Sequence, residues 1–446
     1  MPKRVVIIGG GFSGLSAGVA LAGAGHRVRV LERRNHLGGR AYSFIDSRTG
    51  DVVDNGQHLF MGCYRHTIAF LKRIDRLDRL HFQARPRVDF LDLNHEFASF
   101  SCPPLPPPLH ALAGLFGMGG ITLGDKFRAL NIGRALQSDT ERGAESSRQN
   151  GQTVDLWLDG LKQSSRIKER FWYPMSIATL NENPGTASAR MLIKVLREAF
   201  GGGREATRIG ISRVGLSDLY TDGAQRFIED RGGEVRTGAA VTGLNIGRGK
   251  VVSAELKDGA EVGGDYFISA VPPNALYSLL PESFRAGEFA YLARLESSPI
   301  VSINLWFDRP VIDRAFVGLI GTRIQWIFNK DLTLSLDKKS NQIAVIISAA
   351  RGFVDWTKDE LVEMALAELT RLLPESRTAR LLHSVIVKER EATLAHTVES
   401  DHIRPGPTGP VSNLILAGDW TDTGLPATIE SAVLSGQAAA EIIFNS

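Results

Sequence analysis

Residues 5–14 read Val-Val-Ile-Ile-Gly-Gly-Gly-Phe-Ser-Gly, and this stretch decides the fold. Its four leading apolar residues are β-branched and predict a strand that is buried on both faces. Gly9, Gly11 and Gly14 follow in the pattern G-x-G-x-x-G. Glycine at these positions permits a tight turn, lets the backbone approach a pyrophosphate, and lets the next helix lie against the strand. The stretch therefore predicts one wall of a dinucleotide site.

The residues that follow complete this unit. Residues 15–24 are rich in Ala and Leu and predict a helix, which Gly25 is well placed to end. Residues 26–31 predict the second strand, and Glu32 closes it. Glu32 stands roughly 20 residues beyond the turn, where an acceptor for a ribose hydroxyl is expected. The succession of strand, glycines, helix, strand and acid predicts a site for an adenine dinucleotide.

The composition describes an ordinary folded chain that is too long for one core. With 446 residues, of which 43% are hydrophobic and 23% charged, we expect two closely joined domains. The formal net charge of +3 is too small to indicate a nucleic-acid partner. Cys63 and Cys102 are the two cysteines, which excludes a disulfide framework and fits a reducing compartment. The sequence has no C-x-x-C pair and no His/Cys/Asp arrangement typical of metal chemistry, so we predict no metal site.

The sequence predicts no membrane-spanning helix, because no apolar run reaches about 18 residues. The first strand begins directly after Met1–Arg4, so no cleavable targeting peptide is expected. We expect a protein in the cytoplasm, either free or at the inner face of the cytoplasmic membrane.

Three segments bear on membrane contact and mobility. Residues 64–80 predict one amphipathic helix, whose basic face suits either an anionic membrane or solvent. Residues 103–108 are proline-rich and exclude a regular element, and residues 109–118 continue as an apolar, flexible stretch. This loop either packs inside the substrate domain or touches lipid and admits an apolar substrate. Residues 141–152 are polar and predict a mobile surface segment.

The second half of the chain changes character. A helix is predicted after Thr357, which forms a capping box with Glu360. Four β-branched, apolar segments surround it and predict strands: 301–307, 324–328, 343–349 and 381–388. This pattern predicts a mixed sheet backed by helices, suited to carrying a cavity.

Two further stretches can contact a nucleotide. Gly38, Gly39 and Arg40 offer backbone N–H groups beside a fixed cation. Near the C-terminus, a predicted buried strand ends in Gly418-Asp419, and a helix begins at about Ala427. A strand-end Asp can bond a polyol hydroxyl, and a helix N-terminus stabilises an anion.

Together these motifs resemble the FAD signatures of flavin amine oxidases and carotenoid desaturases. Residues 33–43 read R-x-x-x-x-G-G-R-x-x-S, a second motif that plain NAD dehydrogenases lack. Within that superfamily, residues 52–64, 178–184 and 417–433 are similar to the hydroxysqualene dehydroxylases, which are desaturase-like flavoproteins of bacterial squalene and hopanoid synthesis.

The resemblance implies an α/β fold with a discontinuous Rossmann-like FAD-binding domain of the glutathione-reductase type. An inserted α+β substrate domain would be built on the mixed sheet. The FAD-binding domain would take residues 1–62, 210–275 and 410–446, and the substrate-binding domain would take 63–209 and 276–409.

The resemblance also implies FAD as the cofactor. FAD would be bound non-covalently, because no cysteine lies near the Gly418–Glu430 motif. The implied contact residues are Gly9, Gly11, Phe12, Ser13, Gly14, Glu32, Arg33, Gly38, Gly39, Arg40, Val241, Gly418, Asp419, Ala427, Thr428 and Ile429.

The implied reaction is the reductive dehydroxylation of hydroxysqualene, an apolar C30 isoprenoid, with the hydroxyl leaving as water. An acid is then needed near the C–O bond. The candidates are Asp54, His58, Tyr64 and Glu430, although Asp54 and His58 can equally satisfy backbone groups in a buried loop.

Two other classes remain open. An oxidative flavoenzyme, such as a carotenoid or phytoene-type desaturase or a flavin amine or protoporphyrinogen oxidase, would use FAD in the opposite direction. A prenyl-binding protein similar to the Rab GDP-dissociation inhibitors shares the fold without redox chemistry. The intact motifs at 33–43 and 418–419 argue against the latter, because that protein needs no flavin contacts.

Overall fold

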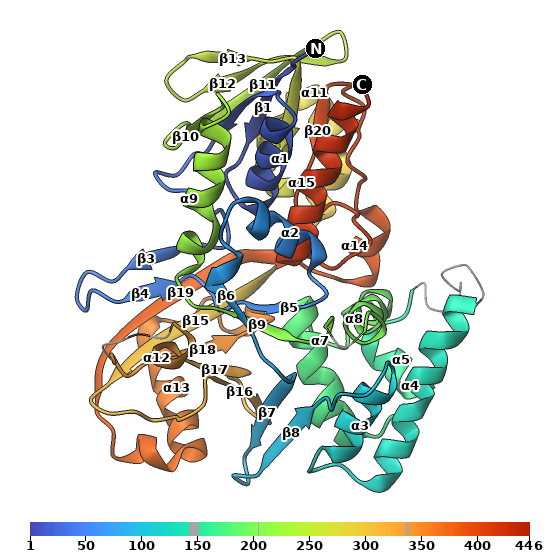
Figure 1. Ribbon diagram of the computed structural model, residues 1–446, viewed down its shortest axis with the longest axis vertical. Coiled ribbons are helices and arrows are strands. Elements are labelled where there is room, and N and C mark those ends of the chain that lie inside the picture. Colours follow the sequence, from blue (N-terminus) through green and yellow to red (C-terminus); the bar gives the residue numbers. More distant parts are fainter. Residues whose placement is uncertain (142–150, 204, 335, 337–338) are drawn as a thin grey trace.

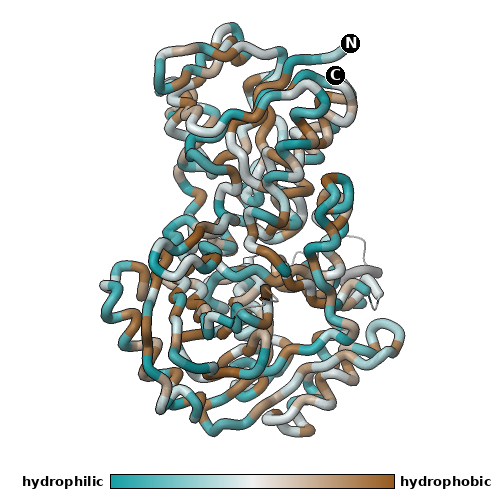
Figure 2. The backbone as a smooth tube through the Cα atoms, turned by 60° about the vertical axis from the view of Figure 1, so that its left-hand side comes forward, coloured by the Kyte–Doolittle hydropathy of each residue, from teal (hydrophilic) through white to brown (hydrophobic). Residues whose placement is uncertain are grey.

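The computed structural model describes residues 1–141, 151–203, 205–334, 336 and 339–446. The molecule has a narrower part that carries both termini and a broader part at the opposite end (Figure 1). Figure 2 shows the same division from another side. Most of the predicted mobile segment, residues 142–150, lies outside the described residues.

A parallel sheet of five strands forms the centre of the narrower part, in the order β10-β2-β1-β14-β20. Its strands come from three separate stretches of the chain: β1 (Arg4–Ile8), β2 (Arg27–Leu31), β10 (Glu234–Arg236), β14 (Tyr266–Ser269) and β20 (Leu414–Leu416). All four pairings are parallel. The carboxyl ends of these strands therefore meet at one edge, where open α/β sheets bind ligands.

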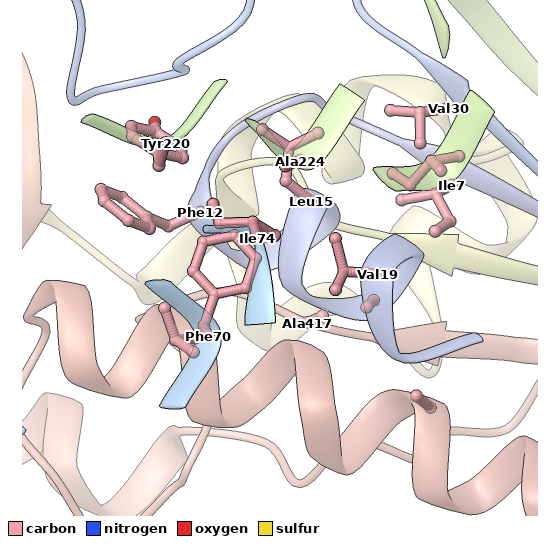
Figure 3. Packing of buried hydrophobic residues seen from close by; sticks show 14 of the residues in the cluster. Ile7, Phe12, Leu15, Val19, Val30, Phe70, Ile74, Tyr220, Ala224 and Ala417 are labelled. Carbon is pink, nitrogen blue, oxygen red and sulfur yellow. The ribbon is translucent and has the colours of Figure 1, made fainter. Parts of the chain in front are cut away.

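Three helices cover one face of this sheet: α1 (Phe12–Gly23), α9 (Leu216–Glu229) and α15 (Ile429–Phe444). Figure 3 shows Leu15 and Val19 of α1 in one cluster with Ile7 and Val30 of the sheet. Burial of each such aliphatic side chain contributes about 1.5–3 kcal/mol. A Cβ atom on Gly14 would lie 2.0 Å from the carbonyl oxygen of Gly9, so only glycine lets α1 start this close to β1.

The other face carries a small antiparallel sheet made of β11 (Val241–Gly247), β12 (Lys250–Leu256) and β13 (Glu261–Gly263). Its core is continuous with the outer face of the parallel sheet, since Val6 and Ile8 belong to the same cluster as Leu244 and Val251. Three short helices complete this side: α10 (Pro273–Leu279), α11 (Glu282–Ala286) and α14 (Val398–Ile403).

A mixed sheet of seven strands forms the broader part, in the order β19-β15-β18-β17-β16-β7-β8. The strands are β7 (Arg87–Asp92), β8 (Phe97–Ser101), β15 (Ser297–Phe307), β16 (Phe316–Ile320), β17 (Trp326–Asn329), β18 (Gln342–Ile347) and β19 (Leu381–Leu394). Only the β16–β7 pairing is parallel among these strands. The predicted mixed sheet is confirmed, and β19 is longer than predicted.

Helices cover both sides of this sheet. The apolar face of α13 (Lys358–Leu372) packs on one side, and its predicted capping box between Thr357 and Glu360 is present. A group of helices lies beside β7 and β8: α3 (Leu109–Gly117), α4 (Leu123–Glu141), α5 (Val154–Gly160), α6 (Ser165–Ile167), α7 (Tyr173–Leu180) and α8 (Ala189–Gly201). The short helix α12 (Lys330–Thr333) follows β17.

Short strands join the two parts. The pair β3 (Ser43–Ile45) and β4 (Val52–Asp54) follows the second glycine motif. A further sheet has the order β5-β9-β6, formed by β5 (Leu59–Met61), β6 (Leu80–Phe82) and β9 (Ile209–Ser212). This sheet combines residues from both proposed domains, so the domain boundaries stay a prediction.

Two sequence predictions differ from the structure. The single helix predicted over 64–80 is shorter, because α2 (Arg65–Arg73) ends before Asp75, which has a φ of +57°. A short 3₁₀ turn follows, and Leu80 already belongs to β6, paired with β9. The flexible stretch predicted over 109–118 is the helix α3, and Pro108 stands just before it, where proline is compatible with a helix start. None of the described helices combines the length and apolar content needed to cross a membrane.

Candidate active site

A cavity of about 850 Å³ begins at the carboxyl edge of the parallel sheet and continues to the mixed sheet. Its first half is lined by backbone of the glycine turn and by polar residues. Its second half is lined by apolar side chains of the broader part. The cavity therefore connects the predicted nucleotide site with a chamber suited to an apolar ligand.

Most of the predicted cofactor residues line the first half. These are Gly9, Gly11, Phe12, Ser13, Glu32, Arg33, Gly38, Gly39, Arg40, Val241, Gly418, Asp419, Ala427, Thr428 and Ile429. Gly14 does not line the cavity, because it lies beneath the turn against the end of β1.

The two ends of the chain meet at this site. The hydroxyl of Ser435 on α15 accepts a hydrogen bond from the amide of Gly418 at 2.8 Å. The same hydroxyl lies 3.0 Å from that of Ser13 in the first turn of α1. Arg40 forms an ion pair with Asp419. The turn at Gly418 is therefore held directly beside the N-terminal glycine turn, as the sequence predicts.

Glu32 is fixed at the rim of the cavity. Its carboxylate accepts hydrogen bonds from the amide of Gly10 at 2.8 Å and from the amide of Arg34 at 2.9 Å. Each carboxylate oxygen has further acceptor capacity, so both can also accept from ribose hydroxyls. The two amides therefore hold the Glu32 carboxylate in one orientation at the cavity wall.

Tyr220 supports the second glycine motif, a role that the sequence does not reveal. Its ring stacks on Phe12 with centroids 3.6 Å apart, and its hydroxyl donates to the carbonyls of Gly38 at 2.8 Å and Ala41 at 3.0 Å. Burial raises the pKa of Tyr220 well above its usual value, so the hydroxyl stays protonated and remains a donor. Tyr220 thus ties α9 to the two glycine motifs.

Two buried side chains hold the C-terminal loop. The guanidinium of Arg404 donates to the carbonyls of Asp419 at 3.0 Å and Leu425 at 2.9 Å. His396 accepts the amide hydrogen of Ala427 through Nε2 at 2.5 Å. Burial lowers the pKa of His396, which keeps this nitrogen free to accept. Arg404 and His396 therefore hold the loop between β20 and α15 in place.

Two of the four predicted proton donors line the cavity. His58 is half-buried on the cavity wall, and its partial removal from solvent lowers its pKa, so its imidazole is neutral near pH 7. Tyr64 is also on the wall, and removal from solvent, followed by the neighbouring Cys63 and then by Glu430, raises its pKa, so its phenol stays protonated. Both can donate a hydrogen bond to an oxygen in the cavity.

Asp54 does not line the cavity. Burial favours its neutral form, but the ammonium of Lys330, the amide of Leu216 and the hydroxyl of Ser43 together lower its pKa. Lys330 Nζ lies 2.6 Å from Asp54 Oδ2 and 3.1 Å from Gln57 Oε1. Gln57 is on the cavity wall, so this buried pair orients a neighbouring wall residue.

Glu430 is likewise directed away from the cavity. Its carboxylate accepts hydrogen bonds from the amides of His66 and Thr67, each at 2.8 Å, and from the Thr67 hydroxyl at 2.7 Å. These amides belong to the first turn of α2, which has no capping side chain of its own. Glu430 therefore caps α2 from α15, a favourable placement for an anion.

Strand β19 brings polar residues that the sequence prediction missed. Glu389, Glu391 and Thr393 alternate along it and line the cavity. Glu389 accepts a hydrogen bond from Asn55 at 3.1 Å, and Glu391 accepts one from Asn274 at 2.5 Å. Their spacing of two residues is the signal that predicts a shared strand face.

Aromatic and aliphatic side chains form the chamber in the second half. Its residues include Phe90, Phe100, Cys102, Phe171, Met175, Val195, Phe200, Ile209, Ile300, Trp326, Phe328 and Ile346. Phe100 packs against Phe171 at 5.0 Å and against Phe200 at 6.0 Å between ring centroids. Burial raises the pKa of Cys102 to about 11, so its thiol adds no charge to this wall. The chamber thus favours an apolar ligand and disfavours water.

The residues of the first half fit FAD. Gly11 and Gly39 face each other without side chains, and a Cβ on Gly39 would lie 3.1 Å from the Cα of Gly11. Arg40, the glycine-turn amides and the fixed Glu32 carboxylate supply the donors and acceptors that a dinucleotide needs. The fold and the site thus define an FAD-dependent oxidoreductase in which a nucleotide-binding α/β unit is joined to a mixed sheet.

The chain belongs to the family of flavin containing amine oxidoreductases, and the sequence model of this family matches residues 12–444. It is 31% identical over 452 residues to the hydroxysqualene dehydroxylase of Rhodopseudomonas palustris, covering 99% of both chains. It is 25% identical over 466 residues to the 15-cis-phytoene desaturase of Synechococcus elongatus, covering 99% of this chain and 95% of the relative.

The fold is also similar to that of a crystal structure of an oxidoreductase from Methanosarcina mazei. The TM-score is 0.77 at 20% identity, with 98% of this chain and 100% of that chain covered. These comparisons confirm the predicted family and fold class.

Proposed function

We propose that this protein binds FAD non-covalently and reduces hydroxysqualene to squalene. The observation that carries the proposal is the continuity of the cavity from the nucleotide motifs into an apolar chamber. The similarity to a hydroxysqualene dehydroxylase over nearly the full chain supports this substrate. A long isoprenoid would gain binding energy from the chamber, because burial of apolar surface is favourable.

The proposed cofactor contacts follow the lining of the cavity. Glu32 would accept from the adenosine ribose, and the amides at Gly9–Gly14 would donate to the pyrophosphate. Arg40 and Asp419 would hold the ribityl and pyrophosphate oxygens, and the first residues of α15 would face the flavin. Neither cysteine lies in the stretch 413–430, which supports non-covalent binding.

Reduced FAD, when bound, would supply a hydride that takes the place of the substrate hydroxyl, and that hydroxyl would take up a proton and leave as water. The chain must provide a dry chamber and a hydrogen-bond donor at the departing oxygen. We assign the donor role to Tyr64 and His58, because both line the cavity. Asp54 and Glu430 are then positioning residues, since their carboxylates are already engaged.

The proposal includes the two-domain division at 1–62, 210–275 and 410–446 against 63–209 and 276–409. It also places the protein in the cytoplasm with membrane contact, because an apolar C30 substrate partitions into lipid.

The test is a single-turnover assay under anaerobic conditions. Photoreduced enzyme is mixed with hydroxysqualene, and squalene is measured by mass spectrometry while flavin absorbance is followed. We expect squalene to form in proportion to reoxidised flavin. If flavin is bound but no squalene forms, the proposal is wrong. Bleaching of the oxidised enzyme by phytoene would instead favour the desaturase reaction.

A chamber variant separates substrate binding from cofactor binding. Ala199 is buried on α8 and lines the chamber. Ala199→Trp should fill it and abolish squalene formation while the flavin spectrum stays intact. Ala199→Gly leaves the space open and should keep the activity.

A further inference from the structure

We propose that the α3–α4 surface, made of Leu109, Phe116, Leu123 and Phe127, docks on an anionic phospholipid bilayer. Three of these side chains are exposed: Leu123 by 69%, Phe127 by 61% and Leu109 by 51%. Scattered exposed leucines are ordinary, but contiguous apolar patches mark interaction sites.

The α3–α4 surface is contiguous. The rings of Phe116 and Phe127 are in edge-to-face contact, with centroids 5.7 Å apart, and this contact joins α3 to α4. Leu109 and Phe116 share one face of α3, because they are seven residues apart in a helix of 3.6 residues per turn. Leu123 and Phe127 share one face of α4 by their spacing of four.

Three cations lie near this surface. Lys126 and Arg128 follow Leu123 on α4, and Lys126 Nζ donates to the carbonyl of Phe116 at 2.6 Å. Arg166 lies close by, because Ser164 at the start of its helix donates to Asp125 at 2.6 Å. The carboxylate of Asp125 is buried and accepts hydrogen bonds from the hydroxyls of Thr122 and Ser164. It also lies 3.8 Å from Arg128 Nη1, so among the three cations it offsets part of the charge of Arg128.

This charge pattern selects one occupant. Exposed apolar side chains with flanking cations fit lipid acyl chains beneath anionic head groups. A second copy of this chain would present the same cations and meet like charge. The surface therefore points to a lipid bilayer rather than to a dimer.

The α3–α4 surface also lies behind the wall of the chamber. The opposite face of α3 packs on β8, where a Cβ on Gly114 would lie 3.0 Å from the carbonyl oxygen of Ser101 and 3.1 Å from the Phe100 ring. His110 of α3 is buried 6.4 Å from Phe200, and Phe100 and Phe200 both line the chamber. One helix thus separates the exposed apolar surface from the proposed substrate site.

This inference deepens the proposed membrane contact and rests on it, but its test needs neither substrate nor turnover. The holoenzyme is floated with vesicles of phosphatidylcholine, with and without phosphatidylglycerol. We expect binding to vesicles that contain phosphatidylglycerol and weaker binding at high salt. Failure to bind would overturn the inference, whereas failure to form squalene would overturn only the proposed reaction.

Variants test whether this surface is responsible. The double variant L123E/F127E should lower the partition coefficient at least about ten-fold, because two apolar anchors are lost. Arg128→Gln should lower binding to the anionic vesicles about five-fold and leave binding to neutral vesicles unchanged. Val252→Glu is the matched control, because Val252 is 62% exposed on β12 at the opposite end of the molecule.

A second measurement does not depend on weakened binding. An environment-sensitive fluorophore on Leu123→Cys should shift to the blue when anionic vesicles are added, and the same label on Val252→Cys should not. Equal behaviour of the two labels would overturn the inference. A dimer by sedimentation velocity that L123E/F127E dissociates would also overturn it in favour of a second copy.

Discussion

The ammonium of Lys330 on α12 lies 2.6 Å from the carboxylate oxygen Oδ2 of Asp54 on β4, and both side chains are almost completely buried. The pair connects the strand that follows the second glycine motif with the mixed sheet. A buried ion pair adds little net stability by itself, but it leaves a costly charge behind when one partner is removed. Its value here is to fix one part of the molecule against the other.

Lys330→Met should lower the free energy of unfolding by about 3–5 kcal/mol, because the Asp54 carboxylate is left buried without its counter-charge. Urea unfolding followed by circular dichroism measures this change. The double variant K330M/D54N should recover much of the loss, because no buried charge remains. Equal stability of the single and double variants would contradict this account.

Arg40→Ala should weaken FAD binding about ten- to a hundred-fold, because hydrogen bonds to charged groups contribute about 1.5–3 kcal/mol. The dissociation constant is measured by flavin fluorescence during reconstitution of the apoprotein. Arg29→Ala is the control. Arg29 lies on the same sheet but does not line the cavity, and it pairs with Glu234 in solvent, with side-chain exposures of 44% for Arg29 and 46% for Glu234. An effect of equal size in both variants would argue against a contact between Arg40 and the cofactor.

Gly14→Ala should yield protein that loses its flavin and melts at lower temperature. The added methyl group would lie 2.0 Å from the carbonyl oxygen of Gly9, so α1 must move away from the turn. Gly133→Ala on α4 adds the same methyl group where nothing lies within 4 Å. This control should keep its flavin, and alanine should slightly favour the helix. Absorbance at the flavin band and a thermal melt distinguish the two variants.

His110 should make the protein less stable in mild acid. Burial lowers the pKa of His110, an effect that the Pro106 carbonyl partly offsets. Below about pH 6.5 the unfolded chain therefore takes up a proton that the folded protein does not, and stability falls as the pH falls.

His110→Leu should remove this contribution. The free energy of unfolding of each protein is compared with its own value at pH 8, where the imidazole is neutral in both states. For each pH unit below 6.5, this free energy should fall by up to about 1.4 kcal/mol less in the variant than in wild type. Urea unfolding at pH 8, 6.5 and 5.5 measures the difference. Parallel curves for the two proteins would contradict the prediction.

The nucleotide half of the fold is predictable from sequence because its signals are local. The glycines at 9–14, Glu32 and the Gly418-Asp419 turn each follow a strand, and parallel strands bring their carboxyl ends to one edge. The family resemblance adds the discontinuous arrangement. The structure then brings Ser13 and Ser435 within 3.0 Å, which no local pattern specifies.

The roles of the acidic candidates could not be predicted, because they depend on distant partners. Asp54 and Glu430 are typical proton-donor residues by type. Asp54 is paired with Lys330, and Glu430 with the amides of His66 and Thr67, across long separations in sequence. The helix over 109–117 was missed for another reason. Proline disrupts a helix only in its interior and is tolerated at its start, so the prolines up to Pro108 do not prevent a helix from beginning at Leu109.

Strand β19 runs from Leu381 to Leu394, is paired along its length with β15, and supplies Glu389 and Thr393 to the cavity wall. This single strand therefore connects the apolar chamber with the half of the cavity that carries the nucleotide motifs. Inserting or deleting a single residue in its middle would turn every later side chain to the opposite side. The two compartments therefore cannot be tuned by mutation as independent modules, and exchange of the mixed sheet between relatives must bring this strand along whole.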